Sequence, residues 1–151
     1  MSIEDRLADL GIDLPPVAKP VAAYVPAIQV DDQISTSGQL PLVSGSLPMT
    51  GLVGDQISQE DAAGQARVAA LNALAAAADV AGGVNNIRRV VRVVVYVANT
   101  ADFTAQPAVA NGASELFGEI FGDAGRHIRS AIGVASLPLG APVKVELTVQ
   151  V

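Results

Sequence analysis

The sequence predicts one α+β domain, in which two helices pack on the same face of a mixed β-sheet. The order of the predicted elements indicates this arrangement: two strands, a helix, a strand, a helix and two final strands. The length of 151 residues suits a single domain, and 50% of the residues are hydrophobic, which is enough for one core. We therefore treat residues 1–151 as one domain, with residues 1–23 as an N-terminal arm.

The N-terminal arm carries no recognisable sorting signal. Residues 2–10 can form a short helix, after which Gly11 and the prolines at positions 15, 16 and 20 force an extended chain. The first residues lack the basic and long apolar segments of a secretory signal. No apolar stretch is long enough to span a bilayer. We therefore expect a cytoplasmic protein.

The segment after the arm is typical of a β-hairpin. Residues 24–30 and 34–37 have strand composition, and residues 31–33 are suited to the turn between them. We expect Gly38, which follows the second strand, to adopt a backbone conformation that other residues avoid. Residues 41–54 are rich in glycine, proline and serine, and this composition predicts a loop.

Residues 59–81 have the clearest helical pattern in the chain. Ser58 with Asp61 three residues later resembles a capping box, and the residues that follow are dense in alanine and leucine. Gly82 supplies a left-handed stop. Small apolar residues recur at helical spacing and predict close packing of one face against a sheet: Ala66, Ala69, Ala70, Ala73, Leu74 and Ala77.

Residues 87–98 are typical of a buried strand because valine dominates them. Both alternating sets of side chains are mostly apolar, so we expect both faces of this strand to be covered. Helices can cover only one face. A second copy of the chain is the simplest cover for the other, and we therefore expect a homo-oligomer whose sheets pack together.

A second helix and two strands complete the predicted domain. The helix ends at residue 121 and begins at 103 or 108, because Pro107 and the pair Asn111-Gly112 interrupt its apolar pattern. The two strands are predicted at residues 128–136 and 142–150, on either side of a turn.

The composition excludes several kinds of chemistry. Cysteine is absent, and the single histidine, His127, cannot form a histidine-rich metal centre. No glycine-rich phosphate-binding loop is present, so we expect neither a metal nor a cofactor. The net charge of −6 disfavours nucleic acid as a partner. We interpret His127 as a surface or interface residue, with a catalytic base as the alternative.

Arg129 is the most informative candidate for a functional residue. It lies in an apolar stretch, and no acidic residue occurs between Asp123 and Glu146. A charge removed from water is costly, and the planar guanidinium binds a carboxylate through two parallel hydrogen bonds. We therefore predict that a carboxylate ligand neutralises Arg129, with a structural ion pair as the alternative.

Several segments resemble the Rid family, also known as the YjgF family or by the older label endoribonuclease L-PSP. The similar positions, in matching order and spacing, are residues 37–41, 129–138 and 145–147, together with Tyr24, Asp102, Phe103 and Asn111. This resemblance covers the chain from about Tyr24 to Val151. It implies a chorismate-mutase-like fold, a homotrimer with sheets packed into a central barrel, and no cofactor.

The resemblance also implies a ligand site in a cleft between subunits. Arg129 would bind the substrate carboxylate, Gly38 would offer backbone hydrogen bonding, and the carbonyl near Ala131 would help to orient water. The residues that would line the cleft are Tyr24, Ser37 and Asn111. The alternatives are an interface packing role for Tyr24 and a local backbone hydrogen bond for Ser37.

One position of the implied site has two candidates. In the active subgroup a glutamate on the last strand helps to bind the attacking water. Counting from Arg129 without a gap places Lys144 there, whereas a longer turn would bring Glu146, which shares its strand face. Lys144 would favour anion binding, and Glu146 would favour catalysis.

The resemblance therefore implies a cofactor-independent enamine/imine deaminase. Such an enzyme hydrolyses 2-imino acids or enamines, such as 2-aminoacrylate, to 2-keto acids and ammonia, with Arg129 and Glu146 as the catalytic residues. The alternative is a noncatalytic binder of small carboxylates or 2-keto acids in the same cleft, with Lys144 among its binding residues. Ribonuclease activity, which the older label suggests, is disfavoured by the negative charge and by the single histidine.

Overall fold

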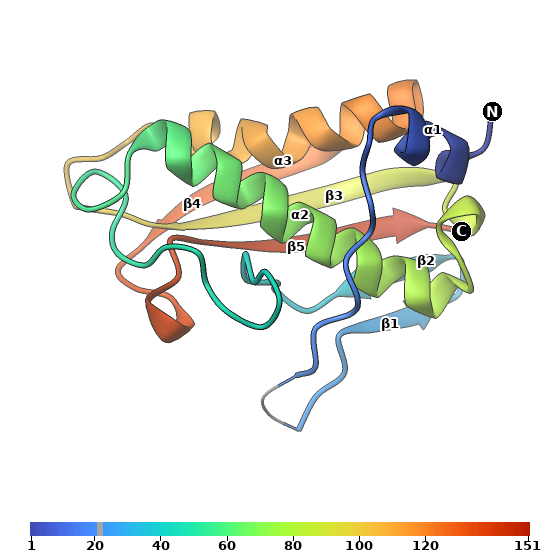
Figure 1. The fold of residues 1–151 in the computed structure, drawn as a ribbon, viewed down its shortest axis with the longest axis horizontal. Coiled ribbons are helices and arrows are strands. Elements are labelled where there is room, and N and C mark those ends of the chain that lie inside the picture. The colour runs from blue at the N-terminus through green and yellow to red at the C-terminus, as the bar shows by residue number, and fades with distance from the viewer. Residues whose placement is uncertain (21–22) are drawn as a thin grey trace.

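The computed structural model describes residues 1–20 and 23–151, so residues 21 and 22 of the predicted arm lie outside the described part. The elements are α1 (Ile3–Asp9), β1 (Ala27–Val30), β2 (Gln33–Thr36), α2 (Gln59–Ala81), β3 (Arg89–Ala98), α3 (Gln106–Phe121), β4 (Ile128–Val134) and β5 (Val143–Gln150). The sheet has the order β1-β2-β5-β3-β4, and α2 and α3 lie together on one of its faces (Figure 1). This confirms the predicted mixed sheet with both helices on the same side.

The strand order places the end of the chain in the middle of the sheet. β5 pairs antiparallel with both β2 and β3, while β4 pairs parallel with β3 and forms one edge. The last two strands are therefore consecutive in sequence but not neighbours in the sheet. In the β3–β4 register Arg129 lies beside Val93, a fully buried residue, so the Arg129 side chain projects toward the helices.

The ends of α2 confirm the predicted boundaries. The Ser58 hydroxyl accepts a hydrogen bond of 3.1 Å from the backbone N–H of Asp61. At the other end Gly82 adopts a left-handed conformation with φ of 78°. The small apolar face of α2 is buried as expected, and the buried Asn72 amide donates to the carbonyls of Leu40 and Leu42 at 2.9 and 3.0 Å. That amide fixes the loop after β2 to the helix.

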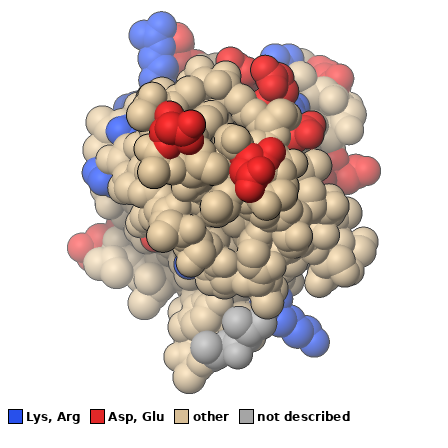
Figure 2. All heavy atoms as spheres, turned by 90° about the vertical axis from the view of Figure 1, so that its left-hand side faces the viewer, with Lys and Arg blue, Asp and Glu red and all other residues tan. Residues whose placement is uncertain are grey.

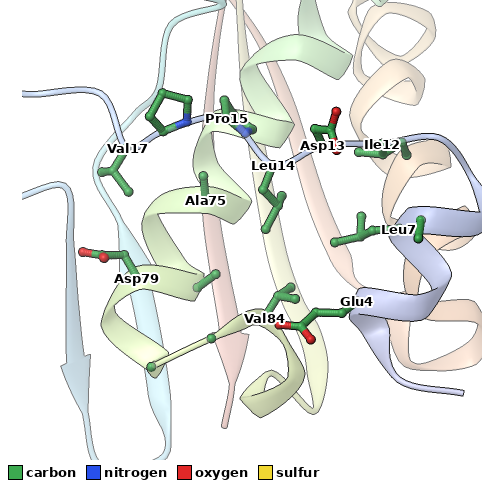
Figure 3. A pocket seen from close by; sticks show the side chains of 15 residues that line it. Glu4, Leu7, Ile12, Asp13, Leu14, Pro15, Val17, Ala75, Asp79 and Val84 are labelled. Carbon is green, nitrogen blue, oxygen red and sulfur yellow. The ribbon is translucent and has the colours of Figure 1, made fainter.

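The N-terminal arm contains the short helix that the sequence predicts and then crosses α2 in extended form. The Ser2 and Asp5 side chains form a reciprocal capping box at the start of α1. Leu7, Leu14 and Val17 point from the arm toward a cavity of about 750 Å³ whose other wall is the second half of α2 (Figure 3). The arm is thus packed on the domain over the described residues.

The two faces of β3 differ from the expected alternation. A register shift between Val90 and Arg92 brings Val90 into the core with Val93, Val95 and Val97. The face away from the helices instead carries Arg92, Val94 and Tyr96 of β3. This open face is partly polar, but large apolar side chains are exposed along its edge strands: Ile28, Val30, Ile128 and Ile132.

Gly112 of α3 explains why the sequence interrupts the helical pattern at this position. A Cβ at Gly112 would collide with the backbone carbonyl of Ala63 in α2, so the two helices approach closely only because this residue is glycine. Replacing Gly112 with alanine is expected to cost about 1–3 kcal/mol, because rigid backbone must move. Gly64→Ala is the matched control: a Cβ there has no neighbour within 4 Å.

Thermal unfolding measures both variants. Gly112→Ala should lower Tm by roughly 2–4 °C for each kcal/mol lost, whereas Gly64→Ala should leave Tm unchanged or raise it, since alanine favours a helix. Equal Tm values for Gly112→Ala and the wild type would contradict the close packing of α2 and α3.

Candidate functional site

The Arg129 guanidinium is held by two neutral side chains of α3. Its Nη1 donates to Oδ1 of Asn111 at 2.7 Å and to Oγ of Ser114 at 3.2 Å. Arg129 is half-buried, and it forms no ion pair with any carboxylate in residues 1–20 and 23–151. The structural ion pair considered as an alternative is therefore not found in the described part. The positive charge is fixed in place and remains available to an anion.

Ser114 connects Arg129 to His127. The His127 Nδ1 lies 2.6 Å from the carbonyl oxygen of Gly125, which can only accept, so we assign the proton to Nδ1. Nε2 then accepts from the Ser114 hydroxyl at 2.9 Å. This leaves the oxygen of Ser114 as an acceptor for the guanidinium. The contact with His127 thus positions the Ser114 hydroxyl beside Arg129.

The cavity beside this hydrogen-bond chain has a volume of about 460 Å³, and we call it the Arg129 cavity. Three of its seven lining residues are glycines, which add no side chain to the cavity. Its residues are Ser114, Gly118, Gly122, Gly125, Arg126, His127 and Arg129. Arg126 lies 3.8 Å from Asp123, but both side chains are almost fully solvated and that pair is weak.

Glu146 lies on the opposite face of the sheet from Arg129. In the β3–β5 register Glu146 is beside Val94, on the open face, and its Oε1 accepts a hydrogen bond of 3.1 Å from the Tyr96 hydroxyl. Desolvation raises the pKa of Tyr96, and the negative charge of Glu146 raises it further. The Tyr96 hydroxyl therefore stays protonated and acts as the donor that holds the carboxylate.

Lys144 lies on the same face as Glu146 but lines a separate cavity of about 250 Å³, which we call the Lys144 cavity. Three predicted site residues, Tyr24, Gly38 and Lys144, come together there. The other residues that line it are Ala18, Lys19, Pro20, Pro26, Gln39, Leu40, Leu42, Pro138 and Leu139.

Gly38 is required for space rather than for backbone conformation. Its φ is not among the positive values, so the expectation of a special conformation is wrong. A Cβ at Gly38 would instead collide with the side-chain carbons of Lys144, which lie directly over it. Hydrogen bonds on either side fix the position: Ser37 N–H donates to Pro26 at 2.8 Å, and Gln39 N–H donates to Val145 at 2.8 Å.

The remaining predicted residues are only partly assembled. The Ser37 hydroxyl donates to the Pro26 carbonyl at 3.3 Å, which is the local backbone bond considered as its alternative role. Ala131 of β4 lies beside Val95 of β3, on the same side of the sheet as Arg129. In one chain, Arg129 and its partners therefore lie on the helix side of the sheet. Lys144 and Glu146 lie on the open face, and Lys144 lines its own cavity there.

The sequence did not single out Ser114 or Lys19 as site residues. Ser114 follows Asn111 by three residues in α3, and this spacing alone places the two on one helix face. Lys19 lies in the arm, and its position at the Lys144 cavity depends on how the arm crosses the domain. Its only signal in the sequence is that the chain has just two lysines.

Clustered metal-ligating side chains and dense basic patches are the usual features of metal sites and nucleic-acid sites. No group of three or more His, Asp or Glu side chains in the described part of the chain could hold a metal ion. Acidic and basic side chains are scattered over the end of the molecule seen in Figure 2, with no dense basic patch on that face. Among the helices that the structure describes, none is both long and apolar enough to cross a membrane.

The structure is a small α+β domain in which an arginine held by two neutral side chains lines a cavity. Residues 4–151 match the family described as "YjgF/chorismate mutase-like, putative endoribonuclease", and the chain belongs to this family. It therefore has the YjgF/chorismate-mutase-like fold.

Similar proteins support this assignment over almost the whole chain. Protein TCP17 of Trypanosoma cruzi is 39% identical over 146 residues, which cover 96% of this chain and 91% of that protein. A 2-iminobutanoate/2-iminopropanoate deaminase of Dermatophagoides farinae is 29% identical over 136 residues, covering 89% and 91%. The crystal structure of a "putative endoribonuclease" from Shewanella oneidensis superposes with a TM-score of 0.96 at 32% identity, covering 100% of both chains.

Proposed function

We propose that this protein is an enamine/imine deaminase that hydrolyses 2-imino acids to 2-keto acids and ammonia. The observation that carries the proposal is the Arg129 guanidinium, which Asn111 and Ser114 hold without a carboxylate partner among the described residues. Membership of the family and the similarity to a deaminase support the same activity.

The proposed reaction depends more on positioning the imine carbon beside water than on chemical activation of the substrate. Arg129 binds the carboxylate of the imino acid and presents the adjacent C=N carbon to water. Water adds to that carbon, and one of its protons reaches the nitrogen. The new hydroxyl then gives its proton to the amino group, the C–N bond breaks, the C=O bond forms and ammonia leaves. An enamine first moves a proton to carbon to become the imine. Glu146, the acidic residue of β5, accepts the proton of the attacking water, and Tyr96 fixes its carboxylate.

The site we propose is shared by two copies of the chain. Arg129 and Glu146 project from opposite faces of the sheet, so one chain does not bring them together. Lys144 and Glu146 share one face of β5, so a cleft between the Arg129 cavity of one copy and this face of the next copy would bring Arg129, Lys144 and Glu146 together. Packing of the open faces in a homotrimer would also cover Ile28, Val30, Ile128 and Ile132, which are exposed in the single chain.

Hydrolysis of 2-iminopropanoate tests the activity directly. An amino-acid oxidase generates the imine from alanine, and semicarbazide traps what remains. Addition of the protein should reduce the amount of trapped imine and speed the formation of pyruvate and ammonia. Equal amounts of trapped imine with and without the protein, over a wide range of protein concentration, would reject the deaminase proposal.

A noncatalytic carboxylate binder is a second candidate, and the position of Lys144 favours it. The Lys144 side chain, rather than a carboxylate, lines the cavity with Tyr24 and Gly38, and an ammonium group there suits anion binding better than water activation. Calorimetry with 2-oxobutanoate separates the two candidates. Binding without any acceleration of imine hydrolysis would favour the binder, and both candidates require binding to depend on Arg129.

Ser114 is expected to act as a positioning residue. Ser114→Ala removes one of the two acceptors of Arg129 Nη1 and leaves His127 Nε2 without its donor. We expect kcat/KM for 2-iminopropanoate to fall about 10-fold, because one charge-assisted hydrogen bond is lost. Ser114→Thr keeps the hydroxyl and should restore most of the activity. If Ser114→Ala has a lower Tm than the wild type but the same kcat/KM, the role of Ser114 is structural only.

A further inference from the structure

Both lysines of the chain line the same cavity. Lys19 belongs to the arm and Lys144 to β5, more than 120 residues apart in sequence, yet both contribute to the Lys144 cavity. None of the residues that line this cavity is acidic, although the chain carries 15 acidic and 9 basic residues. Neither lysine forms an ion pair with a carboxylate in the described ranges 1–20 and 23–151. The cavity therefore concentrates positive charge in an acidic protein.

The stem of the Lys144 side chain packs against Gly38. Its carbons lie directly over Gly38, at a point where only glycine leaves room for them. The apolar stem is thus held against the backbone, and the ammonium group extends beyond it. Leu40, Leu42 and Leu139 form apolar parts of the cavity wall. An ammonium group beside apolar walls gains most from an anion that it can bind directly.

Neutral donors at the same cavity also suit an anion. Among the described residues, the backbone N–H of Gly38 has no acceptor within the chain, whereas the N–H groups of Ser37 and Gln39 are both bonded. The Tyr24 residue lines the cavity and carries a hydroxyl that can donate. Lys144, Gly38 and Tyr24 thus offer donors of different kinds in one small space.

We propose that the Lys144 cavity binds a second carboxylate of the substrate, so that this protein prefers dicarboxylic 2-imino acids. This inference rests on the proposed function, in which Arg129 of one copy faces the Lys144 cavity of another. Arg129 neutralises the carboxylate next to the imine. A monocarboxylic substrate would leave Lys144 and Lys19 without an anion, whereas a dicarboxylic one neutralises both ends of the cleft.

The size of the cavity fits a short substrate arm. A volume of about 250 Å³ is slightly below the ~300–1,000 Å³ typical of sites for drug-sized ligands. The second carboxylate takes no part in the bond changes: water still adds at the imine carbon, and ammonia still leaves from it. Its contribution is binding and orientation, so it should affect KM and the discrimination between substrates more than kcat.

The test compares 2-oxoglutarate with 2-oxobutanoate in binding, and the imines made from glutamate and alanine in hydrolysis. For the wild type we expect 2-oxoglutarate to bind at least about 10-fold more tightly than 2-oxobutanoate, because its second carboxylate adds one hydrogen bond to a charged group. Lys144→Met should remove this preference, because it should weaken the binding of 2-oxoglutarate by about 10-fold more than that of 2-oxobutanoate. Arg88→Met also removes one positive charge, but Arg88 lies just before the start of β3, whereas Lys144 pairs with Tyr96 near the end of that strand. This control should preserve the preference for 2-oxoglutarate.

The outcomes separate this inference from the proposed function. Equal or weaker binding of 2-oxoglutarate, or an equal loss for both keto acids in Lys144→Met, would overturn the preference for a second carboxylate, whatever the hydrolysis assay shows. Preferred binding of 2-oxoglutarate without hydrolysis of either imine would support the second carboxylate site and reject the deaminase. Far-UV circular dichroism and Tm confirm that each variant is folded.

Discussion

Replacing Arg129 with lysine is expected to reduce kcat/KM for 2-iminopropanoate by about 100-fold or more. The substitution keeps the positive charge but removes the planar fork that binds a carboxylate through two hydrogen bonds. It also removes the nitrogen that Asn111 and Ser114 hold at 2.7 and 3.2 Å. A lysine ammonium on a flexible stem cannot occupy the same position, so the imine carbon is no longer presented to water.

The measurement combines imine hydrolysis with calorimetric binding of 2-oxobutanoate for Arg129→Lys and Arg129→Ala. Arg88→Lys is the matched control, because Arg88 is exposed and lies outside both cavities. Its kcat/KM should equal that of the wild type. Full activity in Arg129→Lys would show that charge alone suffices. Full activity in Arg129→Ala would remove Arg129 from the site.

Gly38→Val is expected to reduce kcat/KM for the dicarboxylic imine made from glutamate by roughly 10- to 100-fold, because its side chain would occupy the space of the Lys144 stem and displace the ammonium group. The fold should be retained, since Lys144 is flexible and half-exposed and can move aside. The affinity for 2-oxoglutarate should fall together with the activity.

A double-mutant cycle tests whether substitutions at Gly38 weaken 2-oxoglutarate binding through Lys144. Gly38→Ala should weaken 2-oxoglutarate binding in the wild-type background but cost little in a Lys144→Ala background, which lacks the three Lys144 carbons that lie nearest to a Cβ at residue 38. Equal losses in the two backgrounds would show that Gly38 is needed for another reason, such as close approach of the ligand to its backbone.

The fold was predictable mainly where signals are local. Ser58 and Gly82 mark both ends of α2, and the alanine periodicity between them predicts its buried face. The bulge at Val90 was not predictable, because nothing in an all-valine pattern reveals a register shift. The central position of β5 is likewise a property of long-range pairing. Gly112 interrupted the helical pattern for a reason that only the contact with Ala63 explains.

Some residues that line the two cavities, such as Arg129 and Lys144, could be proposed from the sequence, but their grouping could not. Arg129 stands out because a single cation lies in an apolar strand without a nearby acid. The choice between Lys144 and Glu146 could not be made from sequence, since residues two apart share a strand face. The structure distinguishes them through partners distant in the chain: Gly38 contacts Lys144, and Tyr96 donates to Glu146.

Mixing two strongly impaired variants, with the imine made from glutamate as the substrate, tests most directly whether this protein is a deaminase whose site is shared between copies. Arg129→Ala and Gly38→Val are unfolded, combined in equal amounts and refolded together, with wild type and each single variant treated identically. If every site takes Arg129 from one copy and Gly38 from another, about one quarter of the wild-type imine hydrolysis should return, because that fraction of sites combines two intact halves. Light scattering confirms that the assemblies have the same mass. Activity that remains at the level of the separate variants would contradict a shared site.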